Sequence, residues 1–375
     1  MECPEFLRPR LRLFLSADIV GSTALKQTRG PVDVGDLRKH YAWFSVIQGF
    51  YVVARQSLSQ CWAERRGKWP DNDDCFGDEP ELWKTIGDEV IFEKVLTDHR
   101  QLAVTLHCWV EAVEEMRNFV KLRNSSLDIK YAAWLAGFPV RNKEVVLSHK
   151  EELENQDDYN KSSGLLLNEH YANTESSQLS IDYVGPSIDI GFRVASYATP
   201  RKFVLSVGIP YILALTSPTQ SGLIGDFRIF YDGSRPLKGV LGGVNYPLFW
   251  IDLSKEDSID YHEDRLTGHR EAARDDIRRY CDAFYEEHDI YTHRPFIQSP
   301  TEQQISKKPE WWDELHSNLI KNFYLEDDSA SEGPAEGADL GIDQPVDEDK
   351  WQERVSVILG LLSKFQEEDS DDKSS

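Results

Sequence analysis

The sequence predicts an α+β fold, a layered structure of strands and helices that ends near residue 253. Segments with apolar residues at every second position alternate with segments in which apolar residues recur at helical spacing. Short glycine-containing turns join some of the strand-like segments, as in hairpins. The chain has 375 residues, 40% of them hydrophobic and ten of them Trp, so it can fill a substantial core.

The first strand is predicted over residues 11–16, where leucines occupy every second position and indicate one fully buried face. A hairpin is predicted over residues 82–96, with Gly87 and Asp88 at its tip. The other expected elements are a helix over 33–58, a loop over 63–80, a helix over 99–123, a strand over 127–138, a helix over 187–198, a strand over 202–207, and two strands around a glycine-rich turn within 236–252.

The predicted α+β domain occupies residues 1–253, and residues 254–325 are expected to form a mostly helical extension. Residues 326–349 contain ten acidic residues and no Lys or Arg. We therefore expect a disordered acidic linker over 326–350. A short amphipathic helix over 351–367 and a disordered acidic tail over 368–375 are expected to follow.

The formal net charge of −23 disfavours a nucleic-acid partner, but it is compatible with a nucleotide ligand bound through metal ions and local basic residues. The five cysteines are scattered and form no CxxC pair, which favours free thiols in a reducing compartment. No N-terminal stretch resembles a signal peptide, and the apolar runs are far shorter than the roughly 20 residues that span a bilayer. We therefore expect a cytoplasmic protein that does not bind membranes.

An aspartate at the end of the first predicted strand indicates a site for an anionic ligand and a metal ion. Asp18 is followed by IVGST. Its carboxylate and the carbonyl of Ile19 offer hard oxygens to Mg²⁺ or Mn²⁺. The backbone N–H groups of the small residues that open the next helix can face phosphate oxygens; these residues are Gly21, Ser22 and Thr23. The alternative is that Asp18 or Ser22 only caps that helix.

A second aspartate, Asp88, lies at the predicted hairpin tip. Two neighbouring strands can place Asp18 and Asp88 on the same pair of metal ions, an arrangement that suits phosphoryl chemistry. The alternative is that Gly87 and Asp88 form an ordinary turn.

Three motifs in this order and spacing resemble those of the class III nucleotide cyclases. They read FLSADIVGST, KTIGD and DYVGPSIDIGFR, and the resemblance covers roughly residues 8–253. It implies a ferredoxin-like βαββαβ core with extra strands, in which Asp18, the carbonyl of Ile19 and Asp88 hold two divalent cations. It further implies that Arg193 stabilises the charge that develops on the α-phosphate.

The resemblance also implies that Lys238, in LKG, contacts the triphosphate together with Gly21, Ser22 and Thr23. An exposed lysine at a strand end is an equally good interpretation of Lys238 taken alone.

The chain departs from the family pattern at Asp189, where the family has an asparagine four residues before the arginine. A carboxylate there repels a triphosphate unless it is protonated, paired or turned toward the ribose hydroxyls. Family active sites take their aspartates from one catalytic domain and their arginine from another. The resemblance therefore implies a head-to-tail homodimer with two composite sites.

Lys84 and Asp182 occupy the positions that read adenine in ATP-using family members. Finer features, among them AAWLAGFP, YVGPSIDIGFRVASYATPRK and DGSRPLKGVLGG, resemble the Pycsar pyrimidine cyclases, which make cyclic UMP or cyclic CMP in bacterial antiphage defence. That resemblance favours UTP as substrate and implies a separate effector that reads the product. A lysine can donate to uracil O4 or O2, and an aspartate can accept from N3–H.

A pyrimidine leaves the space of the missing purine ring to be filled. Phe50 and Tyr51 on the first long helix are candidates for that role, and plain core packing is the alternative. Three other functions stay open: an adenylate cyclase, a degenerate cyclase-like domain that only binds nucleotide, and a polymerase-like two-metal enzyme. The acidic composition and the lack of interleaved basic and aromatic residues disfavour the last.

Overall fold

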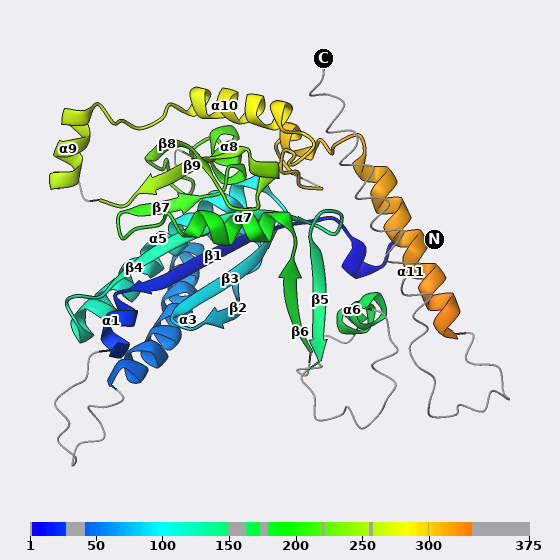
Figure 1. Cartoon of the computed structure of the whole chain (residues 1–375), viewed down its shortest axis with the longest axis horizontal. Coiled ribbons are helices and arrows are strands. Elements are labelled where there is room, and N and C mark those ends of the chain that lie inside the picture. The colour runs from blue at the N-terminus through cyan, green and yellow to red at the C-terminus, as the bar shows by residue number, and fades with distance from the viewer. Residues whose placement is uncertain are drawn as a thin grey trace, which may run out of the picture. The chain divides into compact units, whose positions relative to one another are not determined.

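The computed structural model describes residues 2–27, 42–148, 163–172, 179–219, 222–254, 258–298 and 300–331. Residues Met1–Glu326 form one compact unit, and Asp327–Ser375 are assigned to a second unit. The elements below belong to the first unit, except that the last helix continues past Glu326 (Figure 1).

The first unit is built on a seven-stranded sheet with strand order β2-β3-β1-β4-β7-β9-β8. Its first four strands and two long helices follow each other as βαββαβ, and β1 pairs antiparallel with both β3 and β4. This is the predicted ferredoxin-like arrangement, and the α+β class is confirmed. The elements of this core are β1 (Arg10–Val20), α3 (Ala42–Lys68), β2 (Glu81–Ile86), β3 (Glu89–Leu96), α5 (His99–Arg123) and β4 (Asp128–Phe138).

Three further strands extend the sheet: β7 (Lys202–Leu205) pairs parallel with β4, and β9 (Asn245–Asp252) lies antiparallel between β7 and β8 (Ile229–Pro236). A separate two-stranded sheet contains β5 (Lys143–Ser148) and β6 (Leu179–Val184). The shorter helices are α1 (Ser22–Gln27), α4 (Asp73–Phe76), α6 (Ser163–Ala172), α7 (Pro186–Ala195), α8 (Gly208–Leu215), α9 (Ile259–Thr267), α10 (Arg274–Glu287) and α11 (Trp312–Ser331).

The central strand β1 is buried on both faces, whereas the leucine pattern predicts burial on one. Leu13 and Leu15 face the large core formed with α3 and α5. Phe14 points to the other face and stacks on Trp134 of β4, with ring centroids 5.5 Å apart. Because side chains alternate along a strand, Ser16 and Asp18 share the face of Phe14.

Helix α7 packs closely on that second face. A Cβ atom at Gly191 would lie 2.3 Å from the Trp134 ring, so only glycine allows this approach. On the same strand face, the buried Arg12 guanidinium pairs with Glu144 of β5 at 2.9 Å and with Glu93 of β3 at 2.8 Å. These ion pairs connect the small sheet to the large one.

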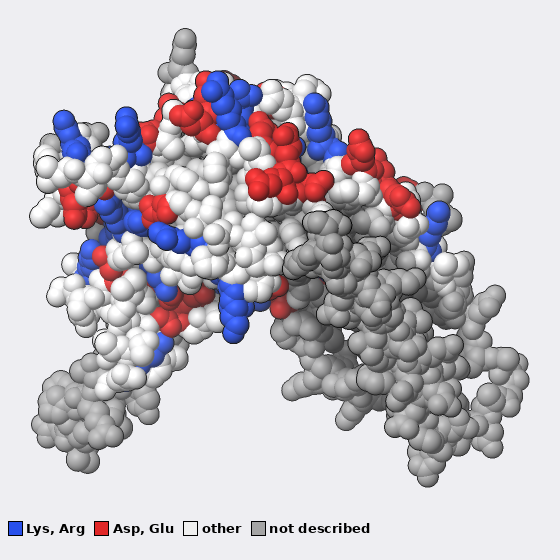
Figure 2. All heavy atoms as spheres, turned by 45° about the horizontal axis from the view of Figure 1, so that its top comes forward, with Lys and Arg blue, Asp and Glu red and all other residues white. Residues whose placement is uncertain are grey.

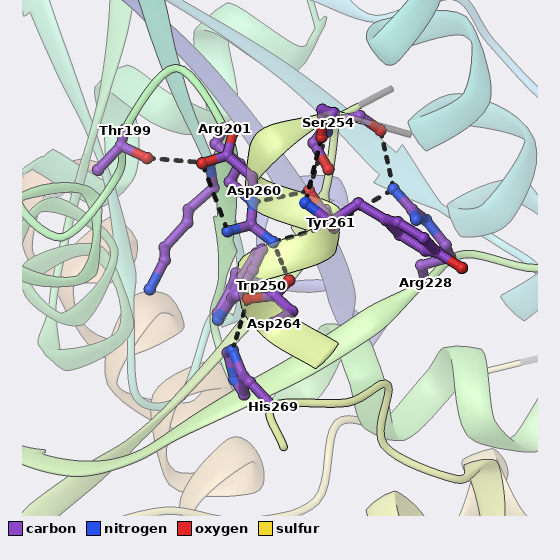
Figure 3. A network of polar contacts seen from close by, with 12 residues as sticks. Thr199, Arg201, Arg228, Trp250, Ser254, Asp260, Tyr261, Asp264 and His269 are labelled. Atoms are coloured by element: carbon purple, nitrogen blue, oxygen red, sulfur yellow. Dashed lines mark hydrogen bonds and ion pairs between the residues drawn. The ribbon is translucent and has the colours of Figure 1, made fainter. Parts of the chain in front are cut away.

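The helical segment after β9 is fastened to the sheet by a polar network (Figure 3). The Arg201 guanidinium lies 3.1 Å from the Asp252 carboxylate at the end of β9 and also pairs with Asp264 of α9. Arg228 reaches the same Asp252 carboxylate at 3.3 Å. The region contains the helices α9, α10 and α11.

Several predicted boundaries were wrong. The predicted loop over 63–80 contains the end of α3 and the short helix α4. In α3, Arg65 still pairs with Glu111 of α5 at 2.8 Å, which stabilises the last helical turns. The helix ends at Lys68, just before Trp69-Pro70. The first of the two terminal strands lies at 229–236 rather than after Pro236. The small sheet, α6 and α8 were not predicted.

Other predictions lie partly or wholly outside the described residues. These are the start of the first helix over 33–41, the part of the 326–350 linker beyond Ser331, the amphipathic helix over 351–367 and the tail over 368–375. The start of the predicted linker was wrong, because α11 continues to Ser331. The five cysteines are free, as expected. Among the described helices, none is long and apolar enough to cross a membrane.

Candidate functional site

The structure brings Asp18 and Asp88 together at one end of the sheet. Asp18 lies opposite Glu89 in the β1–β3 pair, and the Ile19 N–H donates to the carbonyl oxygen of Asp88 at 3.3 Å. Asp88 occupies the two-residue hairpin turn after Gly87, whose φ of +66° favours glycine. The sequence pattern therefore located the turn correctly, whereas β1 continues two residues past Asp18, to Val20.

Two lysines compensate the charge of these aspartates. The Lys130 ammonium lies 2.8 Å from the Asp18 carboxylate, and the Lys26 ammonium lies 2.9 Å from the Asp88 carboxylate. Burial raises the pKa of Asp18 despite the hydrogen bond from Lys130. Burial also opposes the charge of Asp88, but hydrogen bonds from Lys26 and Ser22 outweigh it and hold its pKa below the usual value.

Glu89 is a third carboxylate at this end of the sheet, and sequence reasoning missed it. Burial, together with the negative charge of Asp18, raises the pKa of Glu89 to about 7. Lys130 and Lys26 were missed as well. Lys130 sits directly opposite Asp18 in the β1–β4 pair, so the signal that could have identified it is a lysine in an otherwise apolar strand.

The loop after β1 supports the site through its backbone and one hydroxyl. Gly21 has a φ of +87°, and a Cβ atom there would lie 3.3 Å from the carbonyl oxygen of Ser126. Ser22 is buried and its hydroxyl donates to the Asp88 carboxylate, while Thr23 is exposed. The hydroxyl of Ser22 therefore positions Asp88.

The carboxylates of Asp18 and Asp88 fit a divalent cation whose remaining coordination positions are filled by a bound ligand. Within the described ranges, no group of three or more His, Cys, Asp or Glu side chains could hold a metal ion alone. Asp18 and Asp88 supply two carboxylates. Mg²⁺ is commonly bound by one or two carboxylates with waters and substrate phosphates, rather than by a cage of protein ligands.

The two residues expected to read the base are in contact. Lys84 of β2 lies 2.6 Å from the Asp182 carboxylate of β6, and both side chains are about one-third exposed. Lys84 is opposite Ile91 of β3, and Ile91 is opposite Ser16 of β1. Residues paired across strands share a face, so Lys84 lies on the sheet face of Asp18.

The aromatic candidates occupy other places. Phe50 is fully buried in the core formed by α3, α5 and the opposite sheet face, so its expected role beside the base is replaced by core packing. The Tyr51 hydroxyl donates to the carbonyl oxygen of Gly87. That contact places Tyr51 at the hairpin turn of Asp88 rather than beside Lys84.

The remaining candidates point to solvent. Asp189 and Arg193 are exposed and lie one helical turn apart on α7. Neither forms an ion pair with a described residue, including each other. Lys238 is exposed in the turn after β8. Following the strand directions across the sheet, the end of β8 lies at the opposite end from Asp18. Within one chain, Lys238 is therefore not beside the aspartates.

On the face drawn in Figure 2, Lys and Arg side chains are interspersed with Asp and Glu over the described residues, and no continuous basic surface is seen. A nucleic-acid strand requires such a surface along its backbone. This face is therefore unsuited to a nucleic-acid partner.

No protein-family model and no curated protein matches the chain. Among solved structures, the adenylyl cyclase CyaB from P. aeruginosa aligns with a TM-score of 0.41 and 9% identity over 67% of this chain and 98% of that chain. The guanylyl cyclase Cya2 aligns with a TM-score of 0.36 and 14% identity over 68% of this chain and 96% of that chain. The guanylate cyclase domain of RhGC from Catenaria anguillulae, in complex with GTP, aligns with a TM-score of 0.36 and 11% identity over 66% of this chain and 100% of that chain. At these TM-scores and identities, the similarities assign neither an activity nor a substrate to this chain.

Proposed function

We propose that the chain is a pyrimidine nucleotide cyclase that converts UTP to 3′,5′-cyclic UMP and pyrophosphate, with UTP favoured over CTP. The observation that carries the proposal is the approach of Asp18 and Asp88, on the face of the large sheet where Lys84 pairs with Asp182 of the small sheet. In this proposal, cyclic UMP is a second messenger of bacterial antiphage defence and a separate effector reads it.

In the reaction, the ribose 3′-oxygen attacks the α-phosphate, the bond to the β-phosphate breaks, and the 3′-hydroxyl proton leaves to solvent. Asp18, the carbonyl of Ile19 and Asp88 would hold two Mn²⁺ or Mg²⁺ ions, which supply positive charge to the phosphates when bound. The backbone N–H groups of the loop after β1 would contact the phosphates. Lys130 and Lys26 pair with the two carboxylates and orient them before the cations arrive, and the hydrogen bond from Lys26 also lowers the pKa of Asp88.

The Lys84–Asp182 pair can bind a uracil while its ion pair stays intact. Among the contacts between described residues, only Oδ1 of Asp182 accepts, from Lys84 and from the Tyr183 N–H, so Oδ2 can accept the uracil N3–H. The Lys84 ammonium has three protons and can donate another of them to uracil O4. The mutual ion pair fixes the rotamers of both side chains, which lowers the entropy cost of binding the base.

The outward orientation of Asp189 and Arg193 suits a head-to-tail homodimer. In such a dimer, Arg193 of one copy would reach the α-phosphate held by the aspartates of the other, and the exposed Lys238 would contact the triphosphate. Asp189, one turn before Arg193, would face the ribose hydroxyls.

The test is to incubate the purified chain with each of the four ribonucleoside triphosphates and Mn²⁺, and to identify the products by mass spectrometry. We expect cyclic UMP as the main product. Cyclic AMP as the main product would instead identify an adenylate cyclase. A folded protein that binds nucleotide and makes no cyclic product would be the degenerate domain.

Asp18→Asn and Asp88→Asn should each lower turnover by at least about 100-fold, because each removes a charged ligand of the cations. Asp289→Asn, at an exposed aspartate that forms no ion pair with a described residue, is the matched control and should keep full activity. Near-normal turnover in a folded Asp18 or Asp88 variant would refute the metal assignment.

The composite site predicts complementation between two inactive variants. Asp18→Ala and Arg193→Ala should each be inactive alone. Mixed in equal amounts with free subunit exchange, half of the dimers are heterodimers with one intact site of two, so about a quarter of wild-type activity should return. A mixture that stays inactive, with exchange confirmed by native mass spectrometry, would refute sites shared between chains.

A further inference from the structure

A cavity of about 300 Å³ lies at the end of the sheet opposite to the candidate metal site. Leu11 near the start of β1 lines it, whereas Asp18 is near the end of the same strand. At about 3.3 Å per residue, roughly 23 Å separate these two positions. Figure 1 shows the chain between α10 and α11 passing near the end of the sheet where β1 begins.

Two parts of the first unit form the walls. Leu96 and Phe138 come from the βαββαβ core, and Ser187 comes from the first turn of α7. The opposite wall comes from the helical extension, between Tyr285 and Trp312. Ligand pockets occur preferentially at such junctions between structural units.

The charge of the lining is opposite to that of the whole chain. In a protein with a formal net charge of −23, the cavity is lined by Arg8, Arg10, Arg141 and a single carboxylate, Glu5. Glu5 pairs with Arg8 at 2.8 Å and with Arg10 at 2.7 Å. Three arginines and one glutamate leave the lining with a net formal charge of +2, and Arg141 is the arginine among them that does not pair with Glu5.

Arg141 is partly buried and forms no ion pair with a described residue. Its guanidinium donates to the carbonyl oxygen of Tyr291, which leaves further N–H groups for another acceptor. Burial lowers the pKa of the His293 imidazole in the lining, and the charge of Arg141 lowers it further, so the neutral form of His293 is favoured and it adds no charge to the cavity. A guanidinium removed from water without a counter-ion is costly, and an anion in the cavity would relieve that cost.

Six aromatic residues contribute to the apolar part of the lining, beside aliphatic residues, and can pack against a flat ring. They are Phe138, Tyr246, Tyr285, Tyr291, Phe296 and Trp312. The volume lies at the small end of the range for ligand pockets, which limits the ligand to a compact molecule.

We propose that this cavity binds a compact organic anion with a flat aromatic body, whose charged group pairs with the Arg141 guanidinium while its ring packs among the aromatic side chains. The site is separate from the candidate metal site, so the proposal does not depend on the proposed function.

A pair of fluorescent probes tests the proposal on the full chain. 1-Anilinonaphthalene-8-sulfonate carries a sulfonate on an aromatic body, and N-phenyl-1-naphthylamine has the same rings without the charge. Fluorescence titration should show saturable binding of the sulfonate. Arg141→Gln should weaken it by at least about tenfold, the value of one charged hydrogen bond. The neutral probe should bind the wild type and Arg141→Gln equally.

Arg279→Gln is the matched control, because Arg279 is exposed on α10 and forms no ion pair with a described residue. It should bind the sulfonate like the wild type, and a saturating mixture of Mn²⁺ and UTP should not displace the probe. Should Arg141→Gln not fold by circular dichroism, raising the salt from about 50 to about 500 mM provides a second measurement on the wild type. Salt should weaken binding of the sulfonate and leave the neutral probe unaffected.

Any one of the following results would overturn the proposal. They are the absence of saturable sulfonate binding, equal affinity in folded Arg141→Gln, an equal loss of the neutral probe in that variant, and displacement by Mn²⁺ with UTP. Equal salt responses of the two probes would do so as well.

Discussion

Asp98 connects the start of α5 to the segment that precedes α11, and Asp98→Asn tests how much that connection stabilises the fold. Its carboxylate accepts hydrogen bonds from the Arg100 backbone N–H at 2.9 Å and side chain at 2.7 Å. It also accepts from the Thr301 backbone N–H at 3.0 Å and hydroxyl at 2.6 Å. The residue is 6% exposed, so water does not replace these donors.

The lowered pKa of Asp98 gives the size of its contribution to the free energy of unfolding. Burial opposes its charge, but hydrogen bonds from Arg100 and Thr301 outweigh that effect and lower its pKa from 3.8 to about 2. Because the folded state binds this proton more weakly than the unfolded state, the charge contributes about 2 kcal/mol to the free energy of unfolding at pH 7. This contribution is complete well above pH 4 and is lost as the pH falls through about 2, with roughly half remaining at pH 3.

Urea unfolding followed by Trp fluorescence measures the effect. At pH 7, Asp98→Asn should lower the free energy of unfolding by about 2 kcal/mol without changing the denaturant slope, and the difference from wild type should shrink by roughly half at pH 3. Asp289→Asn should change stability by less than about 0.5 kcal/mol at either pH. Equal stability of Asp98→Asn and wild type at pH 7, or a difference independent of pH, would refute the assigned role of the charge.

Two further predictions concern α7 and α5. Gly191→Ala should lower the free energy of unfolding by about 1–3 kcal/mol, because the new methyl group would overlap the Trp134 ring. Gly67→Ala is the control: no atom lies within 4 Å of the Cβ position of this helical glycine, so the substitution should be neutral or stabilising. Equal effects of the two substitutions in thermal melts would contradict the packing of α7 on Trp134. Burial lowers the pKa of His107 to about 4, so the unfolded state binds the imidazole proton more readily than the folded state. As the pH falls from 6.5 toward 4, the free energy of unfolding of the wild type should therefore decrease by up to about 3 kcal/mol. His107→Gln keeps an acceptor for the Gly225 N–H, and its free energy of unfolding should decrease measurably less over that range.

The central sheet and both long helices could be predicted because their apolar periodicities are long and local. Helix α5 spans the predicted range, and the hairpin turn was located to the residue. The small sheet could not be predicted in this way, since β5 and β6 are far apart in sequence and their pairing is a non-local property. The end of α3 was missed because its last turns are polar, and their helical state depends on contacts such as that between Arg65 and Glu111.

The candidate site was predictable in its motif residues and not in their partners. Asp18 and Asp88 follow from strand ends and turn chemistry. Lys130 and Glu89 flank Asp18 only because of the register of three strands, which a single sequence does not specify. The cavity at the other end of the sheet was also not predictable, because one of its walls comes from the extension after β9.

The register of β1 connects the fold to the site. Ala17 and Ile19 lie in the core beside α3 and α5, whereas Asp18 faces the other side of the sheet. A slip of one residue would turn Asp18 into that core, where an uncompensated carboxylate costs several kcal/mol, and would move the leucines out of it. The same slip would bury Leu13 in place of Arg12 among Glu93 and Glu144. The apolar pattern and the buried ion pairs therefore select one register, and that register aims the Asp18 carboxylate at Asp88.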